Sequence, residues 1–310
     1  MHDPELARRA LNGLRRFQAA ALPTPKRERP IVYRRQGVTL RDCGGRGSTL
    51  LLIPSLINPP SILDLDPGCS LADALASRHR VLLLDWGAAA ERRELSIDGH
   101  VTERLVPLIK AQGPVTLVGY CLGGTLAMAA ATQCSGVSAV VTLASPYRFD
   151  AYPDDARQRL LSLWRTSQAA VSRLGFMPME VLQSAFWQID PDRLVTKFAR
   201  FAELDASSPQ ASRFVNLEDW ANGGEPVPLP AARQLVEKLF GKGQPLSPLP
   251  ACPMLHVTAA ADRIAPASTA APGDLLSSTA GHVGMIVGRS APTSLHAPLL
   301  SWLDGAARAR

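Results

Sequence analysis

The sequence predicts an α/β protein with a mostly parallel central sheet and helices on both of its faces. Short, continuous apolar runs recur along the chain, as is typical of strands that are buried on both faces. Segments with a helical pattern separate the early runs. The length of 310 residues suits one large domain, with or without an insertion, or at most two domains.

Taken in order, each predicted strand is a short apolar run that ends near a turn-forming residue. The predicted strands are Ile31–Arg35, Leu50–Ile53, Arg80–Trp86, Val115–Tyr120, Val137–Leu143, Pro253–Ala259 and Val283–Val287. Helical patterns lie between the early strands, at Ser70–Ser77, at Ile97–Gln112 and from Thr125 onward.

Residues 1–30 are predicted to form an N-terminal helix and a linker. Leucines and Phe17 alternate with arginines in the helix, and residues 21–30 are rich in proline. Two interpretations of the helix stay open. It either lies on a membrane or another hydrophobic surface as a basic amphipathic helix, or it is a partly packed surface helix.

The alternation of strands and helices breaks between residues 147 and 250. This segment is rich in helical patterns and holds Trp164, Trp187 and Trp220. It lies between two core strands, so we interpret residues 147–250 as a helical cap insertion and residues 31–146 and 251–310 as the core. A cap above the site would exclude water from it.

The composition restricts the classes of function. The 33 basic and 27 acidic residues give a net charge of +6, a mild bias that favours anionic ligands, without a basic run typical of nucleic-acid binding. The five cysteines are widely spaced and form no CxxC pair, which argues against disulfides or a metal site. We expect no cofactor, no signal peptide and no transmembrane helix, and therefore a cytoplasmic protein.

The most informative motif is a G-x-C-x-G sequence in the segment Gly119-Tyr120-Cys121-Leu122-Gly123. It follows a predicted strand and precedes a predicted helix, which is the context of a nucleophile elbow. The elbow usually holds a serine. A cysteine there favours acyl transfer from thioesters, because a thiolate readily accepts and donates such acyl groups. The alternative is a structural cysteine in a glycine-rich turn.

A cysteine nucleophile needs a base, and the base needs an orienting acid. In the α/β-hydrolase fold these groups follow in the order nucleophile, acid, histidine. Asp262 comes just after a predicted strand, and His282 lies in a turn twenty residues further on. The predicted triad is therefore Cys121, Asp262 and His282, with His282 as the base.

Other residues compete for these roles. Asp274, in a Pro-Gly loop, and Asp85, at the end of an earlier strand, are the alternative acids. Among the other histidines, we expect His256 to be a core residue and His79 and His100 to lie at the surface near helix ends. His2 and His296 lie near the chain ends. For the oxyanion hole, we expect the backbone N–H groups of Leu122 and of Ile57, in the loop after Leu50–Ile53.

These motifs resemble the polyhydroxyalkanoate synthases, especially the short class III catalytic subunits. The resemblance covers most of residues 48–290 and rests on five segments: 52–65, 82–87, 119–124, 261–266 and 281–284. It implies that a 3-hydroxyacyl group passes from a coenzyme A thioester to Cys121 and then to a growing polyester. It also implies that Asp262 activates the attacking hydroxyl. The family often has Asp-His-Ile where this chain has Asp262-Arg263-Ile264.

Two other functions stay open at this stage. The same triad with water as acceptor would be a hydrolase: a thioesterase, an esterase or a polyester depolymerase. A third class is a non-catalytic protein that binds or coats polyester granules, against which an intact triad argues. Expected partners are the 3-hydroxyacyl-coenzyme A substrate, a polyester or granule surface, and either a second copy of the chain or a second synthase subunit. No nucleic acid is expected.

Overall fold

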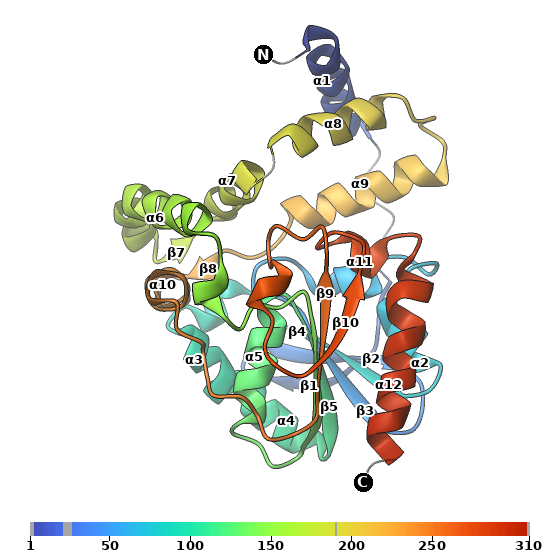
Figure 1. Ribbon diagram of the computed structural model, residues 1–310, viewed down its shortest axis with the longest axis vertical. Helices are drawn as coiled ribbons and strands as arrows, with labels where there is room; N and C mark the ends of the chain where they lie inside the picture. The colour runs from blue at the N-terminus through green and yellow to red at the C-terminus, as the bar shows by residue number, and fades with distance from the viewer. Residues whose placement is uncertain (1–2, 21–26, 190, 309–310) are drawn as a thin grey trace.

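The central sheet of the computed structural model, which describes residues 3–20, 27–189 and 191–308, contains eight strands in the order β1-β2-β4-β3-β5-β6-β9-β10 (Figure 1). The strands are β1 (Ile31–Arg35), β2 (Val38–Gly44), β3 (Thr49–Ile53), β4 (Arg80–Asp85), β5 (Val115–Tyr120), β6 (Val137–Leu143), β9 (Met254–Ala259) and β10 (Asp274–Ser278). The six strands β4, β3, β5, β6, β9 and β10 pair in parallel, whereas β1 and β2 add an antiparallel edge. The predicted fold class is confirmed.

Helices cover both faces of this sheet (Figure 1). On one face lie α3 (Ile97–Gly99), the π-helical segment His100–Leu105, α4 (Val106–Gln112) and α5 (Leu122–Ala131). On the other lie α2 (Leu71–Ala76), α11 (Gly284–Val287) and α12 (Ala297–Arg308). The continuous apolar runs seen in the sequence are the strands between these layers, and β5 is buried at every position.

Two strand predictions need correction. Val283–Val287 is not a strand: Gly284–Val287 forms the short helix α11, and the last strand is β10, which begins at Asp274. A short buried apolar run fits a strand or a helix equally well, because burial hides the periodicity that distinguishes them. Strand β2 was missed, since its charged residues Arg41 and Asp42 interrupt the apolar pattern.

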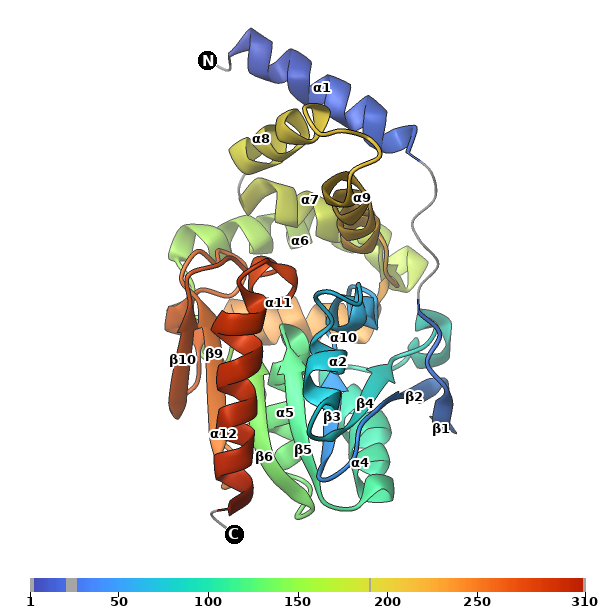
Figure 2. The same ribbon diagram turned by 90° about the vertical axis from the view of Figure 1, so that its right-hand side faces the viewer.

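The segment between β6 and β9 lies above the carboxyl ends of the strands (Figures 1 and 2). It contains α6 (Asp154–Leu174), α7 (Met179–Ile189), α8 (Pro191–Ala202), α9 (Pro209–Asn222), α10 (Leu229–Arg233) and the π-helical segment Gln234–Gly241. The short strands β7 (Phe176–Met177) and β8 (Val227–Pro228) pair with each other.

The N-terminal helix α1 (Pro4–Gln18) packs on α8 at the top of the molecule, away from the sheet (Figure 2). Phe17 contacts Phe198 with ring centroids 6.0 Å apart, and Arg9 pairs with Glu203 at 2.5 Å. Of the two interpretations of this helix, the structure shows the packed one, although Leu11 stays exposed. Residues 21–26 of the predicted linker lie outside the described residues. Within the described ranges, no helix is both long and apolar enough to cross a bilayer.

Candidate active site

Cys121 occupies a sharp turn between β5 and α5. Its backbone has φ 55° and ψ −130°, a conformation that L-residues rarely adopt and that costs on the order of 1–3 kcal/mol. The cysteine N–H donates to the carbonyl oxygen of Leu143, 2.9 Å away, on the neighbouring strand. A Cβ at Gly119 would collide with Gly124, and one at Gly123 with the carbonyl oxygen of Ile53, so the turn requires both glycines.

His282 and Asp262 meet beside this turn. Nδ1 of His282 lies 2.7 Å from Oδ2 of Asp262, and the side chain of Asp262 is completely buried. The other carboxylate oxygen accepts the backbone N–H groups of Ile264 at 2.7 Å and Ala265 at 2.9 Å. These bonds fix the orientation of the acid, which in turn orients the imidazole.

The charge of the site favours a protonated His282. Burial by itself would lower the pKa of this imidazole, but interaction with Cys121 and Asp262 outweighs burial and raises the pKa of His282 to about 10. The arrangement therefore suits an imidazole that holds a proton beside Cys121 and Asp262.

Two buried tyrosines that the sequence reasoning missed hold the loops of this site. Tyr120 donates its hydroxyl to the carbonyl oxygen of His282 at 3.3 Å, and its ring packs against the imidazole with centroids 5.2 Å apart. Tyr152 donates to the carbonyl oxygen of Ile264 at 2.9 Å, next to the acid. Tyr120 directly precedes the cysteine, a position that could have signalled its role.

The two residues expected to supply oxyanion donors, Leu122 and Ile57, line the same cavity as Cys121. Leu122 is the first residue of α5, where backbone N–H groups have no partner within the helix and the helix dipole favours negative charge. Ile57 shares the surroundings of Cys121, but its N–H already donates to Oγ of Ser55 over 3.3 Å. A developing oxyanion would compete with that long hydrogen bond.

The loop 54–59 that carries Ile57 is anchored on both sides. The Trp86 indole donates to the carbonyl oxygen of Pro54 at 3.1 Å, and the Trp220 indole to that of Pro59 at 2.9 Å. The Asn58 amide donates to the carbonyl oxygens of residues 221 and 223 at 3.2 and 3.3 Å. Trp220 and residue 221 belong to α9, so the cap and this loop hold each other.

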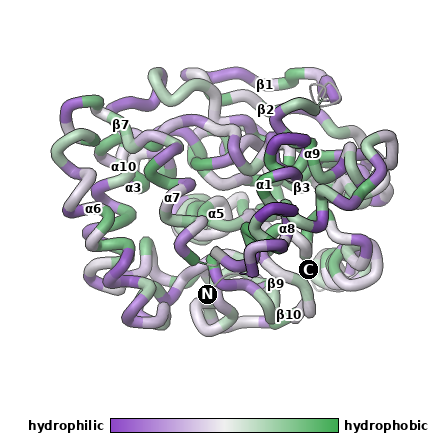
Figure 3. Tube along the Cα trace, turned by 90° about the horizontal axis from the view of Figure 1, so that it is seen from above, coloured by the Kyte–Doolittle hydropathy of each residue, from purple (hydrophilic) through white to green (hydrophobic). Residues whose placement is uncertain are grey.

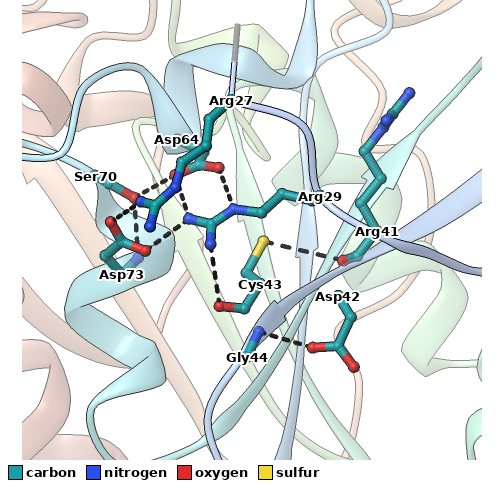
Figure 4. A network of polar contacts seen from close by, with 9 residues as sticks. All are labelled: Arg27, Arg29, Arg41, Asp42, Cys43, Gly44, Asp64, Ser70 and Asp73. Atoms are coloured by element: carbon teal, nitrogen blue, oxygen red, sulfur yellow. Dashed lines mark hydrogen bonds and ion pairs between the residues drawn. The ribbon is translucent and has the colours of Figure 1, made fainter.

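A buried ionic network holds the short 3-10 helix Pro60–Asp64 that follows this loop (Figure 4). Arg29 donates to both oxygens of Asp64 at 2.8 and 2.9 Å and to Asp73 at 2.6 Å. The Ser70 hydroxyl adds a bond of 2.7 Å to Asp64. The network links Arg29, at the start of the core, to the segment that follows the loop 54–59.

The structure places the rival acids away from the triad. Asp85 pairs with Arg41 at 3.1 Å. Asp274 is exposed at the amino end of β10, the opposite end of the sheet, and accepts the indole N–H of Trp302 at 2.8 Å. Active sites of parallel sheets form at the carboxyl ends of the strands, and Asp262 lies just beyond that end of β9.

The remaining described histidines are all buried. As expected, His256 is a core residue, bonded to Thr142 at 2.7 Å. The expectation that His79 and His100 lie at the surface is wrong: they are 5% and 0% exposed. His100 packs against Trp86 and Arg92, because its helix faces the sheet. His296 is buried too, and His2 lies outside the described residues.

Two cavities meet at Cys121 and Ile57. The first, which we call the apolar cavity, measures about 400 Å³ and lies beneath α6 and α7. Its lining includes the apolar residues Phe149, Leu160, Leu163, Leu182, Val236 and Phe240, together with the charged residues Asp155, Arg159, Asp262 and Arg263. The second, which we call the charged cavity, measures about 430 Å³ and lies beneath α8 and α9. Its lining includes Trp187, Arg193, Lys197, Phe214, Glu218 and Arg263.

This geometry can perform nucleophilic acyl chemistry. A thiol at a strained turn, a histidine that exchanges its proton and a helix N-terminus for the oxyanion are the parts that such chemistry needs. The cap covers them with largely apolar walls, which keep water away from an acyl group.

The fold and this arrangement of residues define the class of the protein. Residues 50–301 match the model of the alpha/beta hydrolase family, and the chain belongs to that family. An epoxide hydrolase from Bacillus megaterium has a TM-score of 0.58 at 15% identity, with 89% of this chain and 100% of that one covered. An E-2-(acetamidomethylene)succinate hydrolase gives 0.54 at 17%, with the same coverages. These likenesses show the fold.

Similar curated proteins have a more specific name. The chain is 26% identical to the poly(3-hydroxyalkanoate) polymerase subunit PhaC of Haloferax mediterranei, over 88% of this chain and 63% of that protein. The PhaC subunit of Haloarcula marismortui is 25% identical over 86% and 62%, and that of Synechocystis 25% over 82% and 77%. The chain thus spans less than two thirds of the length of the first two relatives.

Proposed function

We propose that this protein is an acyltransferase that moves 3-hydroxyacyl groups from coenzyme A thioesters, through an acyl-enzyme on Cys121, to a growing polyester. The observation that carries the proposal is a cysteine at the strained elbow beside the buried His282–Asp262 pair. The names of the PhaC relatives support the substrate class.

In the proposed acylation step, the thiolate of Cys121 attacks the thioester carbonyl carbon. The N–H of Leu122 stabilises the oxyanion, and Ile57 contributes the second donor once its bond to Ser55 opens. The bond between the carbonyl carbon and the coenzyme A sulfur then breaks. His282 gives its proton to the departing sulfur, and the acyl group remains on Cys121.

In the proposed transfer step, the terminal 3-hydroxyl group of the growing polyester attacks the carbonyl carbon of the acyl-enzyme. Its proton passes to His282, which Asp262 orients, and Cys121 leaves as a thiolate. The reaction uses no cofactor. The apolar walls around the acyl-enzyme favour the hydroxyl over water as acceptor. The relatives are named as subunits, so we propose a second copy or a second subunit as partner, and a cytoplasmic protein at the surface of its polyester granule.

The test is incubation of the purified protein with 3-hydroxybutyryl-coenzyme A, with free thiol and product measured separately. Thiol release with an oligomer or polyester supports the proposal. Thiol release with only monomeric hydroxy acid would make the protein a thioesterase.

The variant Cys121→Ala should keep its fold and lose turnover, and appreciable residual activity would remove Cys121 from the mechanism. Cys121→Ser should turn over poorly or release hydroxy acid, because a serine hydroxyl ionises less readily than a thiol and its oxygen ester is a poorer acyl donor than a thioester. A serine variant that makes polymer as well as the wild type would contradict the argument from thiol chemistry.

A further inference from the structure

A third cavity, which we call the polar cavity, lies against the loop 54–59 and measures about 470 Å³. It is bordered by the carboxyl end of β4 and by residues 224 and 225, which follow α9. Ile57 lines this cavity as well as the apolar and the charged one, so the loop 54–59 is a shared wall. Cys121 does not line it. Seen from above, the nearby strands β1 and β2 lie at one edge of the molecule, beside hydrophilic stretches of chain (Figure 3).

The polar cavity holds as many carboxylates as arginines, and most of these groups are already paired. Arg27 and Arg29 bind Asp64 and Asp73 (Figure 4), and Arg41 pairs with Asp85. The carboxylates of the lining that have no arginine partner in the described chain belong to exposed residues, which water solvates. The charged residues of the lining are Arg27, Arg29, Arg41, Arg92, Glu28, Asp64, Asp85 and Glu225.

Arg92 differs from these groups because it is buried and has no counter-ion. It is 2% exposed, and no carboxylate of the described residues lies within ion-pair distance of it. Its Nη1 donates to Nε2 of His100 at 3.2 Å, since Nδ1 of that histidine donates to the carbonyl oxygen of Ser96 at 2.7 Å. Its Nε is buried without a hydrogen-bond partner. Burial lowers the pKa of Arg92 to about 10, although Glu225 and Asp85 act in the opposite direction.

A guanidinium with this pKa is still charged at neutral pH, and a buried charge without a counter-ion is costly. A second group of the same cavity also lacks a partner: the hydroxyl oxygen of Ser61 is buried and makes no hydrogen bond. Arginine can only donate hydrogen bonds, and a serine hydroxyl can donate one. Both groups therefore match a ligand that offers negatively charged acceptor oxygens.

We propose that the polar cavity binds a small anion through Arg92 and Ser61, with a carboxylate or a phosphate group as the ligand. The bound anion supplies the counter-ion that the buried guanidinium lacks. It also lies against the loop 54–59, on the side away from Cys121. The inference does not depend on the proposed function, because it concerns a cavity that Cys121 does not line.

The test is calorimetric titration of the protein with two probes, inorganic phosphate and succinate, with sodium chloride at the same ionic strength as reference. Binding of one probe alone identifies the ligand as a phosphate or a carboxylate, and binding of both shows recognition of their shared charged oxygens. In Arg92→Gln the affinity should fall by about tenfold or more, equivalent to about 1.4 kcal/mol. Ser61→Ala should weaken binding to a smaller extent, because it removes a neutral donor.

Arg104→Gln is the matched control and should bind the probes as the parent protein does. Nε of Arg104 is likewise buried without a partner, but this arginine does not line the cavity and bonds to Gln36 at 2.8 Å.

Thermal unfolding gives a second measurement of the same site. Tm of the parent protein should rise with the concentration of the probe, and Tm of Arg92→Gln should not. Ser61→Ala provides the test if Arg92→Gln does not fold. Absence of binding of both probes to the parent protein would overturn the site. Unchanged affinity in the Arg92 and Ser61 variants would overturn it as well, since the probes would then bind elsewhere.

Discussion

At the scale of single residues, the site depends on a backbone that holds Cys121 in an unfavourable conformation and on the bonds that orient Asp262. The strain at the cysteine persists because β5, β6 and α5 leave the turn no alternative. Asp262 has one oxygen committed to two backbone N–H groups and the other to His282. Both oxygens therefore take part in hydrogen bonds that fix the orientation of the carboxylate.

A replacement of Asp262 that keeps its shape should therefore show how much its negative charge contributes to catalysis. Asp262→Asn keeps the size of the side chain but removes the charge that orients and stabilises the imidazolium, so we expect kcat to fall by about 10²–10⁴-fold. Steady-state kinetics with 3-hydroxybutyryl-coenzyme A measure this loss. Asp274→Asn is the control and should keep wild-type kcat, because Asp274 lies at the opposite end of the sheet. Equal losses in the two variants would argue against Asp262 as the acid.

The raised pKa of His282 also predicts how stability depends on pH. The folded state holds the proton up to about 10, whereas the ordinary value is 6.5. The protonated histidine therefore contributes stability that is fully present below pH 6.5 and is lost as pH rises through about 10. Denaturant unfolding of the wild type and of His282→Gln across this window should show a difference that shrinks with rising pH. Parallel curves would contradict a raised pKa.

At the scale of elements, hydrogen bonds and close packing hold the loop 54–59 against α9. The bonds from Trp220 and Asn58 join the cap to the loop of Ile57, and a Cβ at Gly224 would collide with the carbonyl oxygen of Ile57. The position of α9 therefore sets the position of Ile57, the proposed second oxyanion donor. We expect a displacement of the cap to move this donor relative to the substrate carbonyl. Even a small shift of a donor strongly weakens its hydrogen bond to the oxyanion.

Asn58→Ala tests this link. The substitution removes two hydrogen bonds to the end of α9 and should cost about 1–3 kcal/mol of stability. We expect kcat to fall by about tenfold with little change in KM, because the loop positions a donor that acts mainly in the transition state. Asn216→Ala, which loses a 3.3 Å bond from α9 to Asp66 and does not touch the loop, is the control. A change in KM alone would place Asn58 in substrate binding instead.

At the scale of the whole molecule, α1 is distant in sequence from the cap but packs against its outer helix. Gly13 lies directly on α8, where a Cβ would collide with the carbonyl oxygen of Phe198. Arg16 binds the carbonyl oxygens of Ala202 and Leu204 at the end of α8. Arg193 and Lys197 of α8 line the charged cavity. The packing of α1 on the outer side of α8 therefore supports the helix that covers this cavity.

Gly13→Ala should weaken the packing of α1 against α8. An alanine in place of a glycine normally stabilises a helix by about 1 kcal/mol. If α1 and α8 become less ordered in this variant, the cause must be the collision of the new Cβ with α8. We expect faster amide hydrogen exchange in both α1 and α8, measured by mass spectrometry. Asn12→Ala, on the exposed side of α1, should leave exchange in α8 unchanged. Unchanged exchange in the Gly13 variant would show that α1 does not support the cap.

The sequence by itself determined the parallel sheet, the elbow and the order of Cys121, Asp262 and His282. These features depend on local rules: continuous apolar runs form buried strands, and a strained turn between strand and helix requires glycines beside its central residue. The nature of residues 283–287 could not be read in this way, because a fully buried run has no polar face to reveal its period.

Only the tertiary structure decided the burial of His100, the bonds of Tyr120 and Tyr152 to the catalytic loops, and the packing of α1 on α8. Each of these contacts joins segments that local propensities do not relate, or depends on which face of a helix meets the sheet. The division of the space around Cys121 into an apolar and a charged cavity has the same origin, since distant parts of the chain line each one. Such proximity is a property of the folded chain.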